Sequence, residues 1–326
     1  SHPKAHMYQS YQGLPALREA IAGFYHRNYN VVLSPSSDIL PLMGSKEGIM
    51  HISLAFLNKG DQVLIPNPGY PTYSSVTQLV EATPVFYPLS DDNNWQPDFT
   101  ALEALDTTKI KLMWLNYPNM PTGAKAQTET FKRLIQWAKD NEILLVNDNP
   151  YSFILNDNPQ SILSLPNAME VCMELNSLSK SFNMAGWRVG ILAGNEEHIQ
   201  AVLKVKSNMD SGMFYGIQQG AIAALNTPSS WFHELNKVYK RRRVLVEELA
   251  NLMDTTFDPN SVGMFVWAKL NDNSLSAEEY IDKILYEKDI FITPGTIFGS
   301  QGEGYIRFSL CVTEEQIQTA INRIKA

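Results

Sequence analysis

The sequence has few cysteines and no long apolar run. Its 326 residues include only two cysteines, Cys172 and Cys311. Both lie in apolar contexts, so they are predicted to be buried thiols in a reducing compartment rather than parts of a disulfide framework. No apolar run approaches the ~20 residues that a membrane-spanning helix needs, and no signal peptide is visible. We therefore expect a cytoplasmic protein with no membrane partner.

Positive charge is also scarce. The chain has 26 basic and 34 acidic residues, and the formal net charge of −8 argues against a broad nucleic-acid-binding surface. One basic cluster, from Lys237 to Arg243, has the pattern of a solvated helix face. His2 and His6 stand at helical spacing but without a third ligand, so no metal site is predicted.

Apolar residues are abundant, at 44% of the chain, and apolar runs alternate with amphipathic helical stretches. This order predicts an α/β fold in which helices cover a mostly parallel sheet, in a large domain at residues 11–240. From about Trp231 a long helical stretch, further strand-like runs and a helix near Ala277–Lys288 predict a smaller α+β domain at residues 241–326. The strands of the large domain are predicted at residues 38–43, 62–66, 84–89, 109–117, 142–148 and 188–194.

Small and polar loops follow the predicted strands, where ligands bind in sheets of this kind. The stretch GSKEG (residues 44–48) opens a helix, and its backbone N–H groups suit a phosphate or form an ordinary helix start capped by Ser45. The stretch NPGYPTY presents Tyr70, either as a stacking platform or as a packing residue. The turn PNMPTG offers the amide side chain of Asn119.

Two later loops carry charged groups. Asp148 closes the stretch EILLVND, so we expect it to be half buried with a cationic or hydrogen-bonding partner, or else to be a helix cap. The stretch NSLSKSFNMAGWRVG places Lys180 in a small polar loop, and Arg188 follows eight residues later. A solvated surface lysine does not need such a setting, whereas a lysine that forms a covalent bond beside a bound phosphate does.

Taken together, these loops suit one cofactor. A phosphate cradle, an aromatic platform, a buried carboxylate and a lysine are the parts needed to hold pyridoxal 5′-phosphate. An aspartate keeps its pyridine nitrogen protonated, and a lysine amine holds its aldehyde as a Schiff base. The plainer alternative is an α/β protein in which Lys180 is a surface residue and the ordered loops are a coincidence.

In this order, and over essentially the whole chain, the motifs resemble those of the class I and II aminotransferases, which are fold-type-I pyridoxal-phosphate enzymes. The most specific piece is SLSKSFNMAGWRVG, which is similar to the lysine signature of that family. The resemblance implies that Lys180 carries the cofactor. It also implies that the phosphate is bound by Ser45, Lys46, Ser177, Ser179 and Arg188.

The resemblance assigns the remaining site residues as well. Tyr70 matches the aromatic residue that stacks on the cofactor ring, Asp148 the partner of the pyridine nitrogen, and Tyr151 a contact of the ring hydroxyl. Arg307, in GYIRFSL, matches the arginine that binds the substrate α-carboxylate, a bidentate geometry that suits arginine. Tyr8 is similar to a tyrosine that reaches the phosphate in the neighbouring subunit. The resemblance therefore implies a homodimer with shared active sites.

The chain departs from the family pattern in three places. Met120 stands where the ring-hydroxyl asparagine is usual, and Asn119, one residue earlier, is the candidate substitute. Asn149 stands where an acidic residue is common. Family members also have a longer N-terminal segment that closes over the substrate, and residues 1–10 with such a segment would join the small domain or the dimer interface.

The function implied by the resemblance is transfer of an amino group between an L-amino acid and a 2-oxo acid, with ping-pong kinetics. Lys180, Asp148 and Tyr151 would be the catalytic residues. The same cofactor site also supports β-elimination, as in C–S lyases, or decarboxylation. A more distant alternative is a regulatory domain that senses pyridoxal phosphate. The sequence leaves the amino acid and the oxo acid open.

Overall fold

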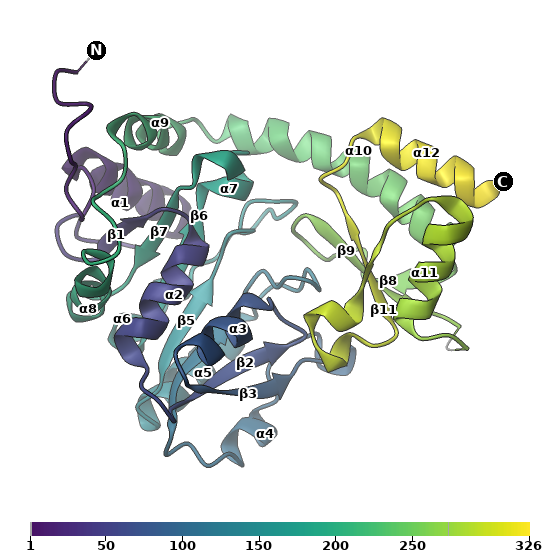
Figure 1. Cartoon of the computed structure of the whole chain (residues 1–326), viewed down its shortest axis with the longest axis horizontal. Helices are drawn as coiled ribbons and strands as arrows, with labels where there is room; N and C mark the ends of the chain where they lie inside the picture. Colours follow the sequence, from purple (N-terminus) through teal and green to yellow (C-terminus); the bar gives the residue numbers. More distant parts are fainter. Residues whose placement is uncertain (1, 273) are drawn as a thin grey trace.

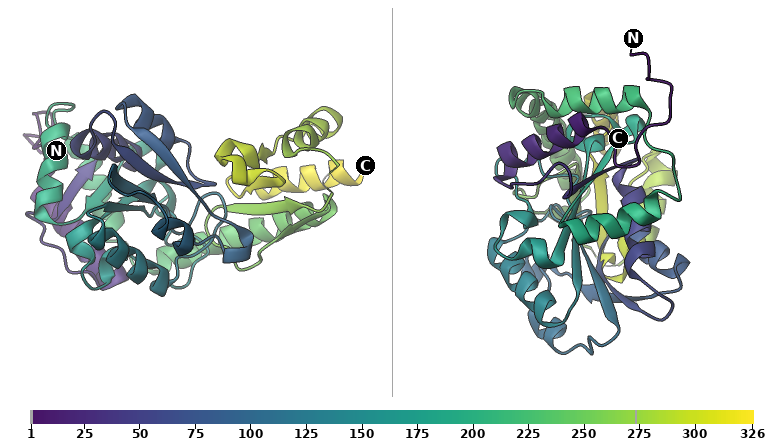
Figure 2. Two further views of the ribbon diagram at one scale, coloured as in Figure 1. Left: turned by 90° about the horizontal axis from the view of Figure 1, so that it is seen from below. Right: turned by 90° about the vertical axis from the view of Figure 1, so that its left-hand side faces the viewer.

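The computed structural model describes residues 2–272 and 274–326. Within these residues the strands form two separate sheets, and the long helix α10 (Ser230–Leu252) runs from one to the other (Figure 1). Figure 2 shows the same two-part arrangement from below, with the small C-terminal part beside the larger one. The boundary predicted between residues 240 and 241 lies inside α10, because one continuous helix packs on both parts.

The larger sheet has the strand order β1-β7-β6-β5-β4-β2-β3. Strands β2 to β6 are paired parallel to one another, whereas β7 is antiparallel to both β6 and β1. This confirms the mostly parallel sheet. The strands are β1 (Ile39–Leu42), β2 (Gln62–Asn67), β3 (Thr83–Pro88), β4 (Ile110–Leu115), β5 (Leu144–Asp148), β6 (Cys172–Ser177) and β7 (Gly190–Ala193).

Helices cover both faces of this sheet, which explains why its inner strands are buried along nearly their whole length. On the first face, apolar side chains of α2, α3 and α8 pack on residues such as Trp114 and Val146. On the second face, α1, α5 and α9 pack on residues such as Met113 and Leu145. These helices are α1 (Pro15–Tyr29), α2 (Ser45–Phe56), α3 (Thr72–Leu79), α5 (Thr128–Asp140), α8 (Glu196–Lys206) and α9 (Tyr215–Leu225). Shorter helices are α4 (Phe99–Glu103), α6 (Ala168–Val171) and α7 (Leu178–Ser181).

The smaller sheet is antiparallel and has the order β10-β11-β9-β8. Its apolar side chains share one core with α10, α11 and α12. Two of these helices begin with a capping box, at Ser276 and at Thr313, which satisfies the first free backbone N–H groups. The elements are β8 (Thr255–Phe257), β9 (Phe265–Leu270), α11 (Ala277–Lys288), β10 (Thr293–Pro294), β11 (Tyr305–Ser309) and α12 (Glu314–Lys325).

Two predictions about single residues need correction. Cys172 is buried as predicted, but Cys311 is exposed, because the chain leaves the sheet after β11. The basic cluster lies on α10, but Arg243 is buried and not solvated. Its guanidinium donates to the backbone oxygens of Asp258 and Ser261, so it holds the turn before β9. No helix in the described ranges is both long and apolar enough to cross a membrane.

Candidate active site

The carboxyl ends of β1, β2, β4, β5 and β6 meet at one edge of the larger sheet, and a cavity of about 280 Å³ lies there. Arg307 reaches this cavity from β11 of the small domain. Most of the residues predicted for the site are brought together in the cavity wall. They are Ser45, Lys46, Tyr70, Asp148, Tyr151, Ser177, Ser179, Lys180, Arg188 and Arg307.

A cradle for an anion forms where β1 turns into α2. Gly44 has a φ of 97°, and a Cβ atom there would lie 2.2 Å from Nη2 of Arg188. A Cβ atom on Gly190 would lie 2.4 Å from the backbone nitrogen of Ser45. These two glycines therefore let Arg188 and the first turn of α2 approach each other closely. Since no side chain of the described residues caps the start of this helix, its first N–H groups and its dipole favour a negatively charged ligand.

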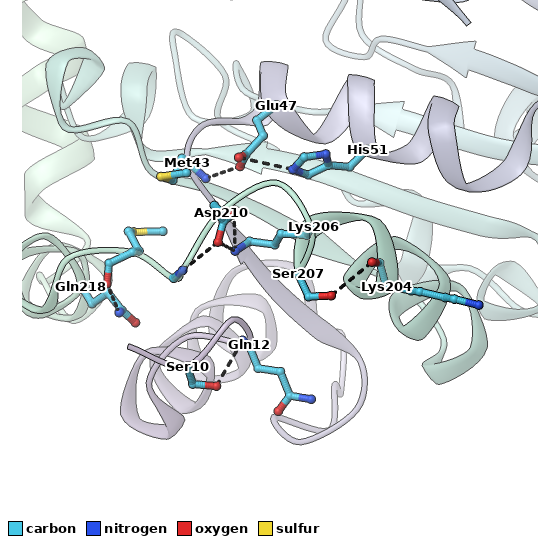
Figure 3. A network of polar contacts seen from close by, with 12 residues as sticks. Ser10, Gln12, Met43, Glu47, His51, Lys204, Lys206, Ser207, Asp210 and Gln218 are labelled. Atoms are coloured by element: carbon cyan, nitrogen blue, oxygen red, sulfur yellow. Dashed lines mark hydrogen bonds and ion pairs between the residues drawn. The ribbon is translucent and has the colours of Figure 1, made fainter. Parts of the chain in front are cut away.

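A network of charged and polar side chains starts at Met43, the residue before Gly44 (Figure 3). A carboxylate oxygen of Glu47 accepts from the backbone N–H of Met43 at 2.6 Å, and the other lies 3.3 Å from Nε2 of His51. Nearby, Lys206 and Asp210 form an ion pair at 2.8 Å with almost no exposure. Ligand atoms of Glu47, His51 and Asp210 lie within 4.8 Å of one another, as in a metal site. Because the Lys206 ammonium already neutralises Asp210, we interpret the group as a structural network.

Asp148 ends β5 and is 5% exposed. Its Oδ2 accepts a hydrogen bond from the hydroxyl of Tyr73 at 3.0 Å, whereas its buried Oδ1 has no partner in the described part of the chain. Burial raises the pKa of Asp148 to about 7, and the Tyr73 hydrogen bond acts in the opposite direction. A free, buried carboxylate oxygen facing a cavity is suited to a cationic N–H donor from a ligand.

The lysine loop follows β6. Ser177 caps α7, since its hydroxyl accepts from the backbone N–H of Ser179 at 3.1 Å. Lys180 is the third residue of this short helix and lines the cavity. Arg188 has a φ of 56° and is tied back by a hydrogen bond from Nη1 to the carbonyl of Ala185 at 2.9 Å. The sequence between the lysine and the arginine therefore forms a compact turn that aims both side chains at one space.

Arg307 lies in an unusual environment for a cation. Its guanidinium carbon is 4.0 Å from the ring centre of Phe265 and 4.5 Å from that of Phe298. Its Nη1 is 3.4 Å from the sulfur of Met120, and its buried Nε has no hydrogen-bond partner among residues 2–272 and 274–326. Burial lowers the pKa of Arg307. No ion pair among the described residues involves it, so this arginine is suited to binding an anion from outside the chain.

The cavity as a whole is electropositive. Its wall holds four cationic side chains, Lys46, Lys180, Arg188 and Arg307, and one carboxylate, Asp148. None of these five takes part in an ion pair within the described residues. Such an excess of positive charge suits a ligand set that brings a phosphate and a carboxylate.

Two predicted residues are not in this wall. Asn119 is buried, but its Oδ1 is occupied by the hydroxyl of Thr122 at 2.8 Å, and Met120 lines the cavity instead. The Nδ2 of Asn119 is buried and has no hydrogen-bond partner in the described ranges, so a role for Asn119 as a ligand of the cofactor stays a prediction. Tyr8 is 90% exposed and lies outside the cavity of its own chain. Its contact with a neighbouring subunit stays a prediction.

Among the polar residues of the wall, sequence reasoning missed Tyr73 and Asn116. Tyr73 stands in the first turn of α3, three residues after Tyr70, and the two rings meet edge-on at 5.6 Å. Asn116 follows β4 directly and donates to the backbone oxygen of Asp148 at 2.6 Å. A polar residue at the carboxyl end of an apolar run, the signal that singled out Asp148, also applied to Asn116.

These groups fit pyridoxal 5′-phosphate. The cradle at Gly44, Ser45 and Arg188 suits its phosphate, and the free Oδ1 of Asp148 suits a protonated ring nitrogen. Tyr70 and Tyr151 line the space between them. Burial raises the pKa of Tyr151, so its hydroxyl stays protonated near neutral pH and is able to donate a hydrogen bond.

Comparison with known proteins agrees with this geometry. The family model for aminotransferase class I and II matches residues 1–324. The chain is 39% identical to LL-diaminopimelate aminotransferase of Aquifex aeolicus over 99% of this chain and 84% of that protein. It is 42% identical to the enzyme of that name from Dehalococcoides mccartyi, over 99% and 83% of the two chains.

Among solved structures, BacF of Bacillus subtilis without ligand superposes with a TM-score of 0.95 at 36% identity, over 99% of this chain and 83% of that chain. An aminotransferase from Staphylococcus aureus gives 0.93 at 33% identity, over 99% and 86% of the two chains. Both the sequence match and the fold extend over the whole chain, including the loops that build the cavity. The chain belongs to the class I and II aminotransferases, and it is an aminotransferase that depends on pyridoxal phosphate.

Proposed function

We propose that Lys180 is the residue that binds the cofactor covalently and moves the substrate proton, with Asp148 and Arg307 as its fixed partners. The observation that carries this proposal is the convergence of these three groups, from three separate loops and two domains, on one cavity. Each is a charged side chain without an ion-pair partner among the described residues. Unpaired charges that converge on one cavity favour a ligand with complementary charges.

The roles follow from the position of each group. Pyridoxal phosphate, when bound, supplies a protonated ring that stabilises negative charge at the substrate Cα. Asp148 Oδ1 would hold the proton on the ring nitrogen, and Ser45 and Arg188 would hold the phosphate. Arg307 would orient the substrate by its α-carboxylate. Nζ of Lys180 would then take the proton that leaves the substrate Cα and return it nearby.

We propose LL-diaminopimelate as the amino donor. Support comes from several relatives named LL-diaminopimelate aminotransferase, which are 38–42% identical over 99% of this chain. Arg307 would bind one of the two amino-acid ends of this substrate. The distal end, an ammonium and a carboxylate with no net charge, does not require a second arginine in the cavity wall.

The first experiment tests Lys180. In protein reconstituted with pyridoxal phosphate, we expect borohydride reduction to label one peptide, the one that contains residue 180. Lys180→Ala should lose that label and the absorbance band of the bound cofactor, and turnover should fall to background. Turnover that persists at the level of the unmodified protein, or a label on a different lysine, would refute the role of Lys180.

The second experiment tests the reaction and the donor. LL-diaminopimelate, L-aspartate, L-alanine and L-phenylalanine are compared as donors with 2-oxoglutarate as acceptor, and kcat/KM is measured for each. We expect LL-diaminopimelate to give the highest value, and we expect the reaction to stop after one half-reaction, with one oxo acid formed per site, when the acceptor is left out. Continued release of ammonia without acceptor would instead indicate a lyase. A different best donor would contradict the substrate proposal alone.

We further propose that the protein works as a homodimer. Residues 2–11 lie against the segment at residues 209–215, where the rings of His6 and Phe214 are 6.2 Å apart. This surface and the turn before α2 expose large apolar side chains, which in a soluble protein commonly mark an interface. The exposed residues are Met7, Tyr8, Met43, Met209 and Phe214.

Sedimentation tests the homodimer. We expect a particle of twice the mass of one chain, and we expect Met209→Glu with Phe214→Glu to produce monomers that bind the cofactor more weakly. Phe86→Glu, at an exposed apolar residue on β3, is the matched control and should remain dimeric. A monomer in the unmodified protein would contradict the proposal.

A further inference from the structure

Tyr73 is a buried tyrosine whose hydroxyl contacts the cavity. It lies on α3, is 0% exposed, and its ring stacks on Trp114 with centres 5.0 Å apart and planes 6° apart. The ring of Tyr70 meets it edge-on at 5.6 Å. Because the ring is fully buried and contacts both Trp114 and Tyr70, it has little freedom, and its hydroxyl is directed at Oδ2 of Asp148 at 3.0 Å.

This contact makes the two carboxylate oxygens of Asp148 different from each other. Oδ2 is occupied by the Tyr73 hydroxyl, and Oδ1 has no partner in the described ranges. The backbone of Asp148 is held separately, because Asn116 donates to its carbonyl oxygen at 2.6 Å. The carboxylate therefore has a single hydrogen-bonded orientation, in which one chosen oxygen remains available.

The direction of the hydrogen bond follows from the environment. Burial raises the pKa of Tyr73 well above its usual value, so the tyrosine keeps its proton and acts as the donor. Burial raises the pKa of Asp148 to about 7, while the donated hydrogen bond stabilises the ionised form. The titratable groups facing Asp148 are Tyr73 and Tyr151, and Lys180 and Arg307 line the same cavity.

We propose that Tyr73 is a positioning residue that acts through Asp148, fixing which carboxylate oxygen faces the ligand and keeping that carboxylate ionised. The hydrogen bond between Tyr73 and Asp148 does not depend on any assigned function. Its importance for the cofactor rests on the proposed role of Asp148. The plain alternative is that Tyr73 is only a packing residue for Trp114. The packing on Trp114 depends on the ring of Tyr73 and not on its hydroxyl. Removal of the hydroxyl alone therefore separates the two possibilities.

Tyr73→Phe keeps the ring and removes the hydrogen bond. Tyr87→Phe is the matched control, since the Tyr87 hydroxyl is also buried and donates to the carbonyl of Trp114 at 2.7 Å, away from Asp148. The titration of Asp148 is followed in cofactor-free protein by carboxyl ¹³C NMR, with Asp148→Asn to assign the signal. We expect the midpoint to rise by about one pH unit in Tyr73→Phe and to stay in place in Tyr87→Phe.

A second measurement uses the loaded protein. Near pH 7.5 the dissociation constant of pyridoxal phosphate should increase roughly 3- to 10-fold in Tyr73→Phe and less than twofold in the control, because fewer Asp148 carboxylates are ionised. In the unmodified chain, exchange from H₂O to D₂O should shift the Asp148 carboxyl signal, which detects the hydrogen bond without any variant.

The outcomes are distinguishable. An unchanged Asp148 midpoint in a folded Tyr73→Phe protein, or no isotope shift in the unmodified chain, would overturn the positioning role. A raised midpoint with an unchanged cofactor dissociation constant would instead contradict the proposed role of Asp148. Neither result depends on the outcome for Lys180→Ala.

Discussion

Two buried carboxylates, Asp148 and Glu174, lie on neighbouring strands but differ in the sheet face they point to and in their hydrogen-bond partners. Asp148 ends β5 and points to the face covered by α2 and α3, whereas Glu174, on β6, points to the other face. Burial raises the pKa of both to about 7. Glu174 is 0% exposed, yet its oxygens accept hydrogen bonds from Ser161, Ile162 and Asn147 at 2.9, 3.2 and 3.3 Å.

The difference between the two acids lies in their hydrogen bonds. Glu174 has partners in the protein for both oxygens, so it ties β6 to β5 and to the segment at residues 161–162. Asp148 keeps one oxygen that no described residue contacts by a hydrogen bond, at the cavity. A carboxylate left incomplete at the end of a strand marks the site of a ligand, and a satisfied carboxylate one strand away has a structural role.

The largest expected effect is on catalytic activity, and it should differ between substitutions of the two acids. Asp148→Asn should lower kcat/KM by about 10²–10³-fold, because it removes the buried charge that would pair with the ring nitrogen. Glu174→Gln should change kcat/KM less than twofold. Steady-state kinetics with the best donor measure both. Comparable losses in the two variants would remove the distinction between the acids.

The same contrast applies to two cations, the half-buried Arg307 and the buried Lys206. Arg307 has no ion pair in the described part of the chain, whereas Lys206 is paired with Asp210. Arg307→Ala should raise KM for the amino donor about 100-fold with little change in unfolding free energy, since it removes a group that binds the ligand. Arg307→Lys, which keeps the charge but not the bidentate geometry, should recover part of this loss.

Lys206→Met should behave in the opposite way. It is expected to lower the free energy of unfolding by about 3 kcal/mol, since it leaves the carboxylate of Asp210 buried without a counter-ion. Urea denaturation measures the stability of both variants, and steady-state kinetics with the amino donor measure KM for both variants. A large stability loss in Arg307→Ala would show that Arg307 is structural.

The smallest effect concerns stability and pH. The pKa of Glu174 is higher in the folded chain than in the unfolded one, so between about pH 4.5 and 7 the folded state binds more protons, and stability falls as pH rises through this range. Glu174→Gln should therefore be more stable than the unmodified protein at pH 8, by about 2 kcal/mol, and similar to it at pH 5.

Thermal and urea unfolding of cofactor-free protein at the two pH values test this prediction. Asp148 contributes equally to both proteins, so its own titration cancels in the comparison. A stability difference that is the same at pH 5 and pH 8 would contradict the raised pKa of Glu174.

Much of the large domain was predictable because its strands are apolar on both faces. Strand β6 was not predicted, and Glu174 and Asn176 explain why. Both are buried polar residues within the strand, and their partners include residues far away in the sequence. A local pattern does not reveal that a glutamate will find three donors inside a core.

The site divides in a similar way. Lys180 and Asp148 were recognisable from a small polar loop and from the end of an apolar run. The resemblance supplied Arg307, but its exposure to the cavity depends on how β11 of the small domain meets the large one. The replacement of an amide by Met120 was visible in the sequence, whereas its contact with Arg307 was not.

The sequence by itself determined most of the order of strands and helices, the polar loops at the strand ends and the residue types available for chemistry, because these depend on local composition and spacing. Tertiary structure decided which of the buried charges were satisfied and which were left open. Partners such as Tyr73 for Asp148 and Lys206 for Asp210 arise from packing, since desolvation and hydrogen bonding act on groups that are close in space.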